Sequence, residues 1–150
     1  MRALRLALTI GMLGVLMAAP AASAVVPAKT TIQIDIVFGV SEDFTTSGDV
    51  LCPSGTAVTD PVYVAGFGSK GRGAGTFHLI KTLTCDDGSG AFQILVNAGS
   101  SPTSSGTVGG FAVIGGTGAY ANLRGGGALV GTYTNDGIID VYTGRLVNGG

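Results

Sequence analysis

Apolar and polar residues alternate along much of the chain. In residues 30–38, TTIQIDIVF, the even positions from Ile32 onward are apolar, whereas Gln33 and Asp35 occupy odd positions. A period of two places successive side chains on opposite faces of an extended chain, so this segment is predicted to be a half-buried strand.

Further strands are expected after turn-forming segments rich in Gly, Ser, Asp and Pro. Residues 41–49, SEDFTTSGD, are expected to be a loop, and residues 50–58 two short extended pieces broken at 53–55. The remaining expected strands are 62–67, 76–85, 91–97, 107–115, 128–134 and 138–147. No segment after residue 24 shows the 3.6-residue period of a helix. About eight short strands joined by turns predict a single all-β domain, a barrel or a sandwich.

Glycine sharpens this picture. The chain contains 27 glycines in 150 residues, against a usual share of about 7 per cent. They follow no Gly-X-Y period, and many fall within apolar strand patterns, where glycine marks bulges, bends and close backbone approach. A small, strongly curved sheet is therefore expected.

The first 24 residues have the pattern of a secretory signal. Arg2 and Arg5 precede an apolar run over 6–19, which is followed by the small residues Ala22-Ser23-Ala24. The run is shorter than the roughly 20 residues needed to span a membrane. We expect cleavage after Ala24, secretion, and a domain comprising residues 25–150 without stable membrane insertion.

Net charge argues against a nucleic-acid partner. Without residues 1–24 the chain keeps six basic and nine acidic residues, a net charge of −3. Binding to nucleic acid depends on many Lys and Arg contacts to phosphate, and no basic cluster is present.

Cys52 and Cys85 are the two cysteines of the chain. In an exported protein they are expected to form a disulfide, with two reduced, buried thiols as the alternative. Closing this loop would stabilise the fold by about 3 to 4 kcal/mol. Two cysteines and one histidine are too few for a structural zinc site, so no metal is expected.

The stretch 113–127, VIGGTGAYANLRGGG, begins like the phosphate-binding turn of a dinucleotide enzyme. Such a turn requires a helix and then a parallel strand. Here three consecutive glycines and a strand-like tail follow, and only about 30 residues of chain remain. We therefore expect a corner of the sheet and no cofactor.

Three side chains carry candidate chemistry. Asp35 would be a general acid if its face were enclosed and a solvated charge if it faced outward, and the row of isoleucines on the other face favours the second alternative. Arg124 either pins the glycine-rich turn or faces a ligand. His78 shares a face with Thr76, Thr82 and Thr84, which makes it outward or cavity-lining.

The glycine-rich stretch also resembles the allene oxide cyclase and dirigent barrel superfamily. The resemblance is carried by Gly115, Gly116, Thr117, Gly118, Tyr120, Arg124 and Gly125, and more weakly by Ile34-Asp35-Ile36. It implies an eight-stranded antiparallel β-barrel with an apolar cavity, often assembled as a homotrimer. Ala121 stands where plant allene oxide cyclases have Glu, so only Asp35 and Arg124 are carried over as catalytic candidates.

Three functions follow from these observations. The first is a secreted barrel that binds a small apolar molecule in its cavity, with Tyr63, His78 and Tyr120 as candidate ligand contacts. The second is a cofactor-free cyclase or isomerase for an unsaturated substrate, using Asp35 and Arg124. The third is a non-catalytic envelope or extracellular protein with a solid barrel. The sequence leaves open whether the protein is an enzyme.

Overall fold

The computed structural model describes residues 25–66, 74–101 and 103–149. The predicted signal segment, residues 1–24, lies outside the described residues and stays a prediction.

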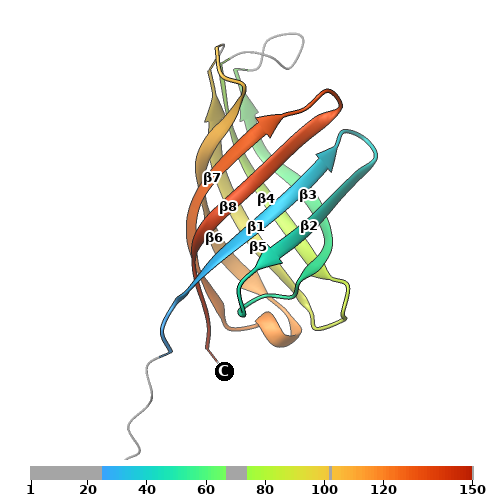
Figure 1. Ribbon diagram of the computed structural model, residues 1–150. Helices are drawn as coiled ribbons and strands as arrows, with labels where there is room; N and C mark the ends of the chain where they lie inside the picture. The colour runs from blue at the N-terminus through green and yellow to red at the C-terminus, as the bar shows by residue number, and fades with distance from the viewer. Residues whose placement is uncertain (1–24, 67–73, 102, 150) are drawn as a thin grey trace, which may run out of the picture.

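The described residues form eight strands that close into one antiparallel barrel, each strand pairing with its neighbours in sequence and β8 pairing with β1 (Figure 1). The strands are β1 (Ala28–Val37), β2 (Ser41–Ser47), β3 (Ser54–Ala65), β4 (Gly75–Cys85), β5 (Ala91–Ser100), β6 (Gly106–Gly116), β7 (Leu123–Tyr133) and β8 (Gly137–Asn148), with a 3₁₀ turn, η1 (Gly118–Tyr120), before β7. The predicted eight-stranded antiparallel barrel is confirmed. The first strand also has the expected facing, because Ile32 and Ile34 are buried and Asp35 is exposed.

Two segments differ from the expectation. Residues 41–47 form β2 rather than a loop, because they pair with β1 over seven positions and place Phe44 in the interior. β3 is one strand rather than two, since a register shift between Pro61 and Tyr63 accommodates the proline.

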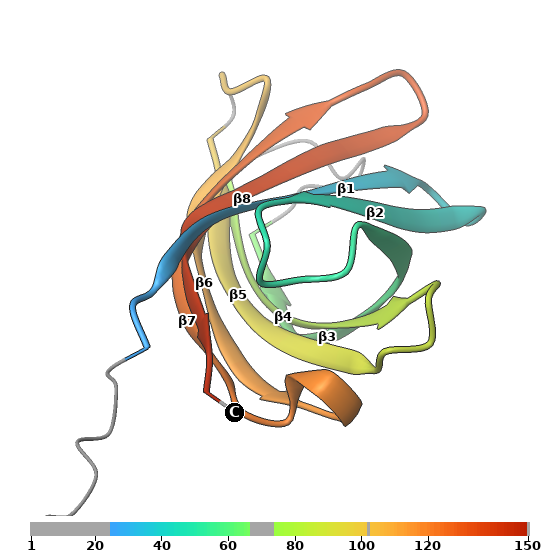
Figure 2. The same cartoon turned by 60° about the horizontal axis from the view of Figure 1, so that its bottom comes forward.

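One end of the barrel, here called the closed end, is covered by residues 48–53. This connection between β2 and β3 folds across the opening (Figure 2) and buries Leu51 and Cys52. Cys52 is joined to Cys85 at the end of β4, with an S–S distance of 2.02 Å, which confirms the predicted disulfide. Thr46 Oγ1 also donates to the Cys52 carbonyl oxygen at 2.7 Å. The disulfide therefore fastens the covering segment to the barrel wall.

The glycine-rich stretch forms a corner at the same end. β6 ends at Gly116, and Gly118 adopts φ +58°, where an added Cβ would lie 2.4 Å from the Ser89 carbonyl oxygen. The backbone needs glycine here for both conformation and space. The expected corner of the sheet is present, although the return strand begins at Leu123 and not at residue 128 as expected.

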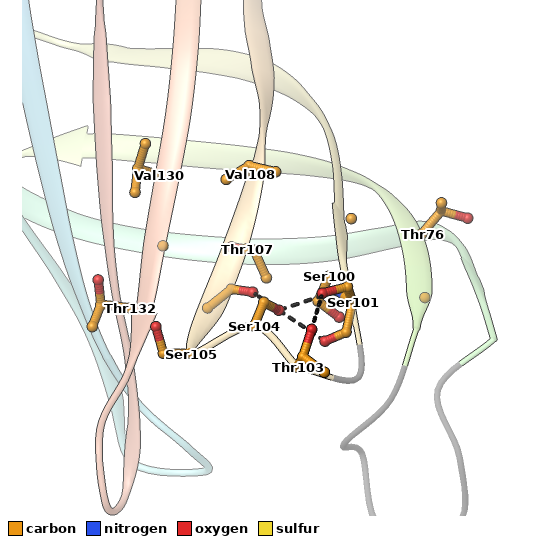
Figure 3. Close-up of a pocket in the computed structure, with 14 residues that line it drawn as sticks. Thr76, Ser100, Ser101, Thr103, Ser104, Ser105, Thr107, Val108, Val130 and Thr132 are labelled. Carbon is orange, nitrogen blue, oxygen red and sulfur yellow. Dashed lines mark hydrogen bonds between the residues drawn. The ribbon is translucent and has the colours of Figure 1, made fainter.

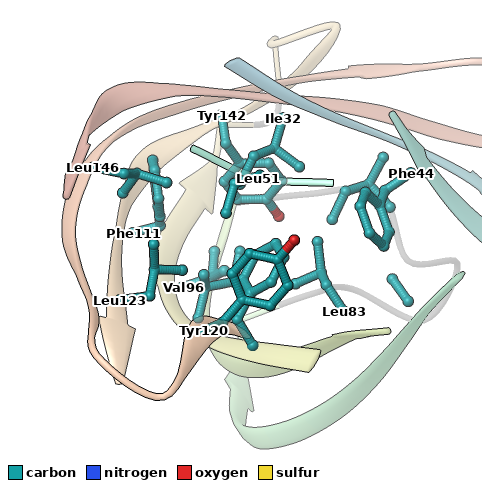
Figure 4. Close-up of a cluster of buried hydrophobic side chains, with 14 of the residues drawn as sticks. Ile32, Phe44, Leu51, Leu83, Val96, Phe111, Tyr120, Leu123, Tyr142 and Leu146 are labelled. Carbon is teal, nitrogen blue, oxygen red and sulfur yellow. The ribbon is translucent and has the colours of Figure 1, made fainter. Parts of the chain in front are cut away.

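Aromatic and aliphatic side chains fill the closed half of the barrel (Figure 4). The ring of Phe92 lies between Phe44 and Tyr120, at centroid distances of 6.1 and 5.5 Å, both edge-on. Phe111 and Tyr142 form a further edge-on pair at 5.4 Å. This half of the barrel is a packed core.

Candidate functional site

The other half of the barrel contains a cavity of about 310 Å³, here called the mouth cavity. It lies toward the end where the β1–β2 and β7–β8 turns are found. Its lining is largely apolar, with Ile36, Phe38, Val64, Phe77, Leu79, Tyr133 and Ile138, and its polar members are Glu42, Thr59, Lys81, Thr107 and Asp140. Small-molecule sites have this composition, an apolar wall with a few polar groups at fixed positions.

Three of the polar residues form one group, here called the ion-pair cluster: Glu42, Thr59 and Lys81. Lys81 Nζ lies 3.1 Å from Glu42 Oε2 and donates to Thr59 Oγ1 at 2.5 Å. Thr59 Oγ1 donates in turn to Glu42 Oε2 at 2.5 Å. Lys81 is 1% exposed, so its ammonium group depends on these oxygens in place of water.

Glu42 is more accessible than its partner, at 22% exposed, because the barrel wall is loosely closed beside it. β2 pairs with β3 only over Asp43–Thr45, and nearer the mouth a hollow of about 530 Å³ separates the β1–β2 hairpin from β3. Glu42 and Thr59 line both this hollow and the mouth cavity. Water therefore reaches the carboxylate of Glu42 from the side.

The second polar group, here called the Asp140 cluster, consists of Thr107, Asp140 and Tyr142. The Tyr142 hydroxyl donates to Asp140 Oδ2 at 3.1 Å. Two buried oxygens of this cluster, Asp140 Oδ1 and Thr107 Oγ1, have no hydrogen-bond partner among the described residues. Leaving a buried polar atom unpaired costs about 1 to 3 kcal/mol, so each such atom calls for an explanation.

Gly131 brings these two oxygens together. Thr107, Gly131 and Asp140 occupy one row across β6, β7 and β8, as the pairings Thr107↔Gly131 and Gly131↔Asp140 show. A Cβ built on Gly131 would lie 2.3 Å from Thr107 Oγ1 and 2.4 Å from Asp140 Oδ1. Ile138 Cδ1 lies 2.9 Å from the same position, so the two oxygens and this methyl group converge where a side chain of residue 131 would stand.

Burial raises the pKa of the Asp140 carboxyl above its usual value. The positive charge of Lys81 and the hydrogen bond from Tyr142 act in the opposite direction, and the negative charge of Glu42 raises the pKa further. Burial and the neighbouring Asp140 also raise the pKa of Tyr142, so its hydroxyl stays protonated and serves as a donor.

The predicted catalytic residues lie outside this site. Asp35 is exposed on the outer face of β1, where Gln33 Nε2 donates to its Oδ1 at 3.0 Å. Arg124 is exposed at the start of β7. Neither side chain reaches the interior. The alternation that buries the isoleucines of β1 turns Asp35 outward, and Arg124 follows the buried Leu123 on the opposite face of β7.

The predicted ligand contacts are likewise separate from the mouth cavity. Tyr63 and His78 lie side by side on the outer face, with ring centroids 5.9 Å apart, and His78 Nδ1 donates to Asn97 Oδ1. Tyr120 is buried in the closed half, where its hydroxyl is 3.0 Å from Ser89 Oγ. It contributes to the core and does not line the cavity.

Sequence reasoning missed the residues that the structure does bring together. Lys81 lies on the apolar face of its strand, between Leu79 and Leu83, and Asp140 lies on the face shared by Ile138 and Tyr142. A charge on the apolar face of an alternating strand was the signal available for both. Glu42 offers no such signal, because the turn-forming residues around it predict a loop.

A further hollow of about 610 Å³ lies beside the loop between β5 and β6 (Figure 3). Glycine and hydroxyl side chains dominate its lining, and none of the described residues that line it is charged or aromatic. Ser104 Oγ donates within the loop, to the carbonyl oxygens of Ser101 and Gly106 at 2.9 and 2.8 Å. These contacts stabilise the loop. The hollow offers a ligand no charged or aromatic partner among the described residues that line it.

The chain matches no protein-family model, curated protein or solved structure with which it was compared. Among the described residues, no cluster of three or more His, Cys, Asp or Glu side chains is arranged to hold a metal ion. Over the same residues, no helix has both the length and the hydropathy of a membrane span.

Proposed function

We propose that this protein is secreted and binds a small, largely apolar molecule in the mouth cavity of its barrel. The observation that carries the proposal is the unequal filling of the barrel, packed with aromatic rings in one half and hollow with apolar walls in the other. Membership of the allene oxide cyclase and dirigent superfamily, and a trimeric assembly, remain part of the proposal through the resemblance of the glycine-rich stretch.

The volume of the cavity limits the size of the ligand. A cavity of about 150 Å³ accommodates benzene, so about 310 Å³ corresponds to a ligand of roughly ten to twelve non-hydrogen atoms. Each buried methylene contributes about 0.8 kcal/mol. Affinity should therefore rise about fourfold with each added methylene until the cavity is full.

A homologous series of 1-alkanols tests this, with binding measured by calorimetry and native mass spectrometry. We expect affinity to increase with chain length and to stop increasing at about ten to twelve non-hydrogen atoms. Leu79→Trp, which fills the cavity, should abolish binding, whereas Val130→Trp on the outer face should not. The proposal would be ruled out if affinity did not change with the chain length of the alkanol, or if both folded variants bound equally well.

A second candidate function rests on Asp140. A buried carboxyl with a raised pKa beside an apolar cavity is also the arrangement of a general acid or base. A cofactor-free isomerase would accordingly use Asp140 and not Asp35. Exchange of the α-hydrogens of 2-nonanone in D₂O, followed by NMR, tests for proton transfer; exchange that is equally fast with Asp140→Asn would exclude it.

A further inference from the structure

Asp140 Oδ1 and Thr107 Oγ1 define a polar point in the wall of the mouth cavity, in addition to the ion-pair cluster. Asp140 is 5% exposed and Thr107 is 2% exposed, and both line the cavity. Since each oxygen lies within 2.4 Å of the Cβ position of Gly131, the two are less than about 5 Å apart. This separation allows one ligand oxygen to bridge both by hydrogen bonds of about 2.8 Å once the Ile138 side chain, whose Cδ1 lies 2.9 Å from the same Cβ position, turns aside.

We infer that the ligand carries a hydroxyl group that donates to Asp140 Oδ1 and accepts from the Thr107 hydroxyl. This inference rests on the proposed function and specifies the chemical class of the ligand, an uncharged apolar alcohol. Asp140 Oδ2 already accepts from Tyr142, so Oδ1 is the oxygen left for a ligand.

The groups around the cavity favour an alcohol over other head groups. A ligand carboxylate would face the carboxyl groups of Asp140 and Glu42. A ligand ammonium would have to give up its water in an apolar cavity that already contains the ammonium of Lys81. A ketone or ether can accept from Thr107 but has no hydrogen to donate to Asp140.

Gly131 makes the arrangement possible, since any larger residue would place a Cβ between the two oxygens. The alternative partner for the two oxygens is an ordered water molecule bound at the same point. A water that stayed at this point would form the hydrogen bonds to both oxygens itself. The ligand would then need no hydroxyl group, and a ketone would bind as well as an alcohol.

The test compares 2-nonanol with 2-nonanone, which have the same number of non-hydrogen atoms, by calorimetry on the native protein at pH 8. Because only the alcohol has a hydrogen to donate to Asp140 Oδ1, it should bind about tenfold more tightly than the ketone. In Asp140→Asn the amide oxygen can continue to accept from Tyr142 while the amide nitrogen replaces Oδ1. The preference for the alcohol should then fall below about threefold or reverse.

Two further variants complete the design. Thr132→Val, an exposed threonine next to Gly131, should leave both affinities unchanged. Thr107→Val should weaken the binding of both ligands by a similar factor, since the alcohol oxygen and the ketone oxygen can each accept from the Thr107 hydroxyl. Equal affinity of alcohol and ketone for the native protein would overturn the inference and leave cavity binding intact, even if Asp140→Asn fails to fold. If neither ligand binds the folded native protein, the proposed function itself fails.

Discussion

The ion-pair cluster gives the sharpest prediction for the energetics of the barrel. Replacing Glu42 by Gln leaves the Lys81 ammonium 1% exposed, with Thr59 as a remaining acceptor but without its adjacent carboxylate. At the observed 3.1 Å and an effective dielectric constant of about 20, the attraction lost is about 5 kcal/mol. Because Glu42 is 22% exposed, part of this attraction is already screened.

We therefore expect Glu42→Gln to lower the free energy of unfolding by about 3 kcal/mol, at the lower end of the range for breaking a buried pair. Urea unfolding followed by circular dichroism measures the change. The double variant Lys81→Met, Glu42→Gln should recover part of this loss, because the unpaired ammonium is gone, whereas the buried Asp140 carboxyl loses the nearby positive charge of Lys81.

Asp43→Asn is the matched control, since Asp43 is the neighbouring acid and is exposed. Its effect should stay within about 0.5 kcal/mol. If Glu42→Gln also costs less than about 1 kcal/mol, and the double variant shows no recovery, then Lys81 is hydrated and its place as a buried ammonium in the ion-pair cluster is wrong.

Three further predictions concern other parts of the fold. Replacing Cys52 and Cys85 by Ser should lower the free energy of unfolding by about 3 to 4 kcal/mol, measured by urea unfolding; an unchanged midpoint would mean that the disulfide does not constrain the chain. Phe92→Ala should cost about 3 to 5 kcal/mol and the outward Gln93→Ala less than about 0.5, and similar losses from both would contradict the assignment of the packed half. Because burial raises the pKa of Asp140, the folded state holds this proton more tightly than the unfolded chain, and the carboxyl lowers stability as pH rises from about 4 through its folded pKa. Asp140→Asn should therefore gain stability relative to the native protein as pH rises from 4 to 8, and a constant difference across that range would refute the assignment.

The barrel could be predicted largely because alternation is strong in the strands that contribute most to the core. Ile32, Ile34 and Leu83 face the interior as the period of two requires. The segment of β2 lacked that signal, since Phe44 is its one large apolar residue and its neighbours are turn formers. Pairing with β1 overrode the local preference of the sequence.

The candidate site was much harder to predict. Asp35, Arg124 and His78 are candidates from sequence because they are polar residues in or beside strands. All three face outward, where polar residues need no partner. The polar residues of the interior are hard to predict for a related reason. Lys81 and Asp140 occupy positions where the alternation predicts an apolar side chain. Which of these positions meet across the barrel depends on strand register, and a single sequence does not specify that register.

Intermolecular NMR contacts between 2-nonanol and the methyl groups of the protein test the occupation of the mouth cavity most directly. We expect nuclear Overhauser effects from the ligand to Leu79 and Ile138, which line the cavity, and none to Val108 or Val130, which are exposed on the outer face. Contacts confined to Val108 and Val130, or the absence of contacts to Leu79 and Ile138 at saturating ligand, would contradict this expectation.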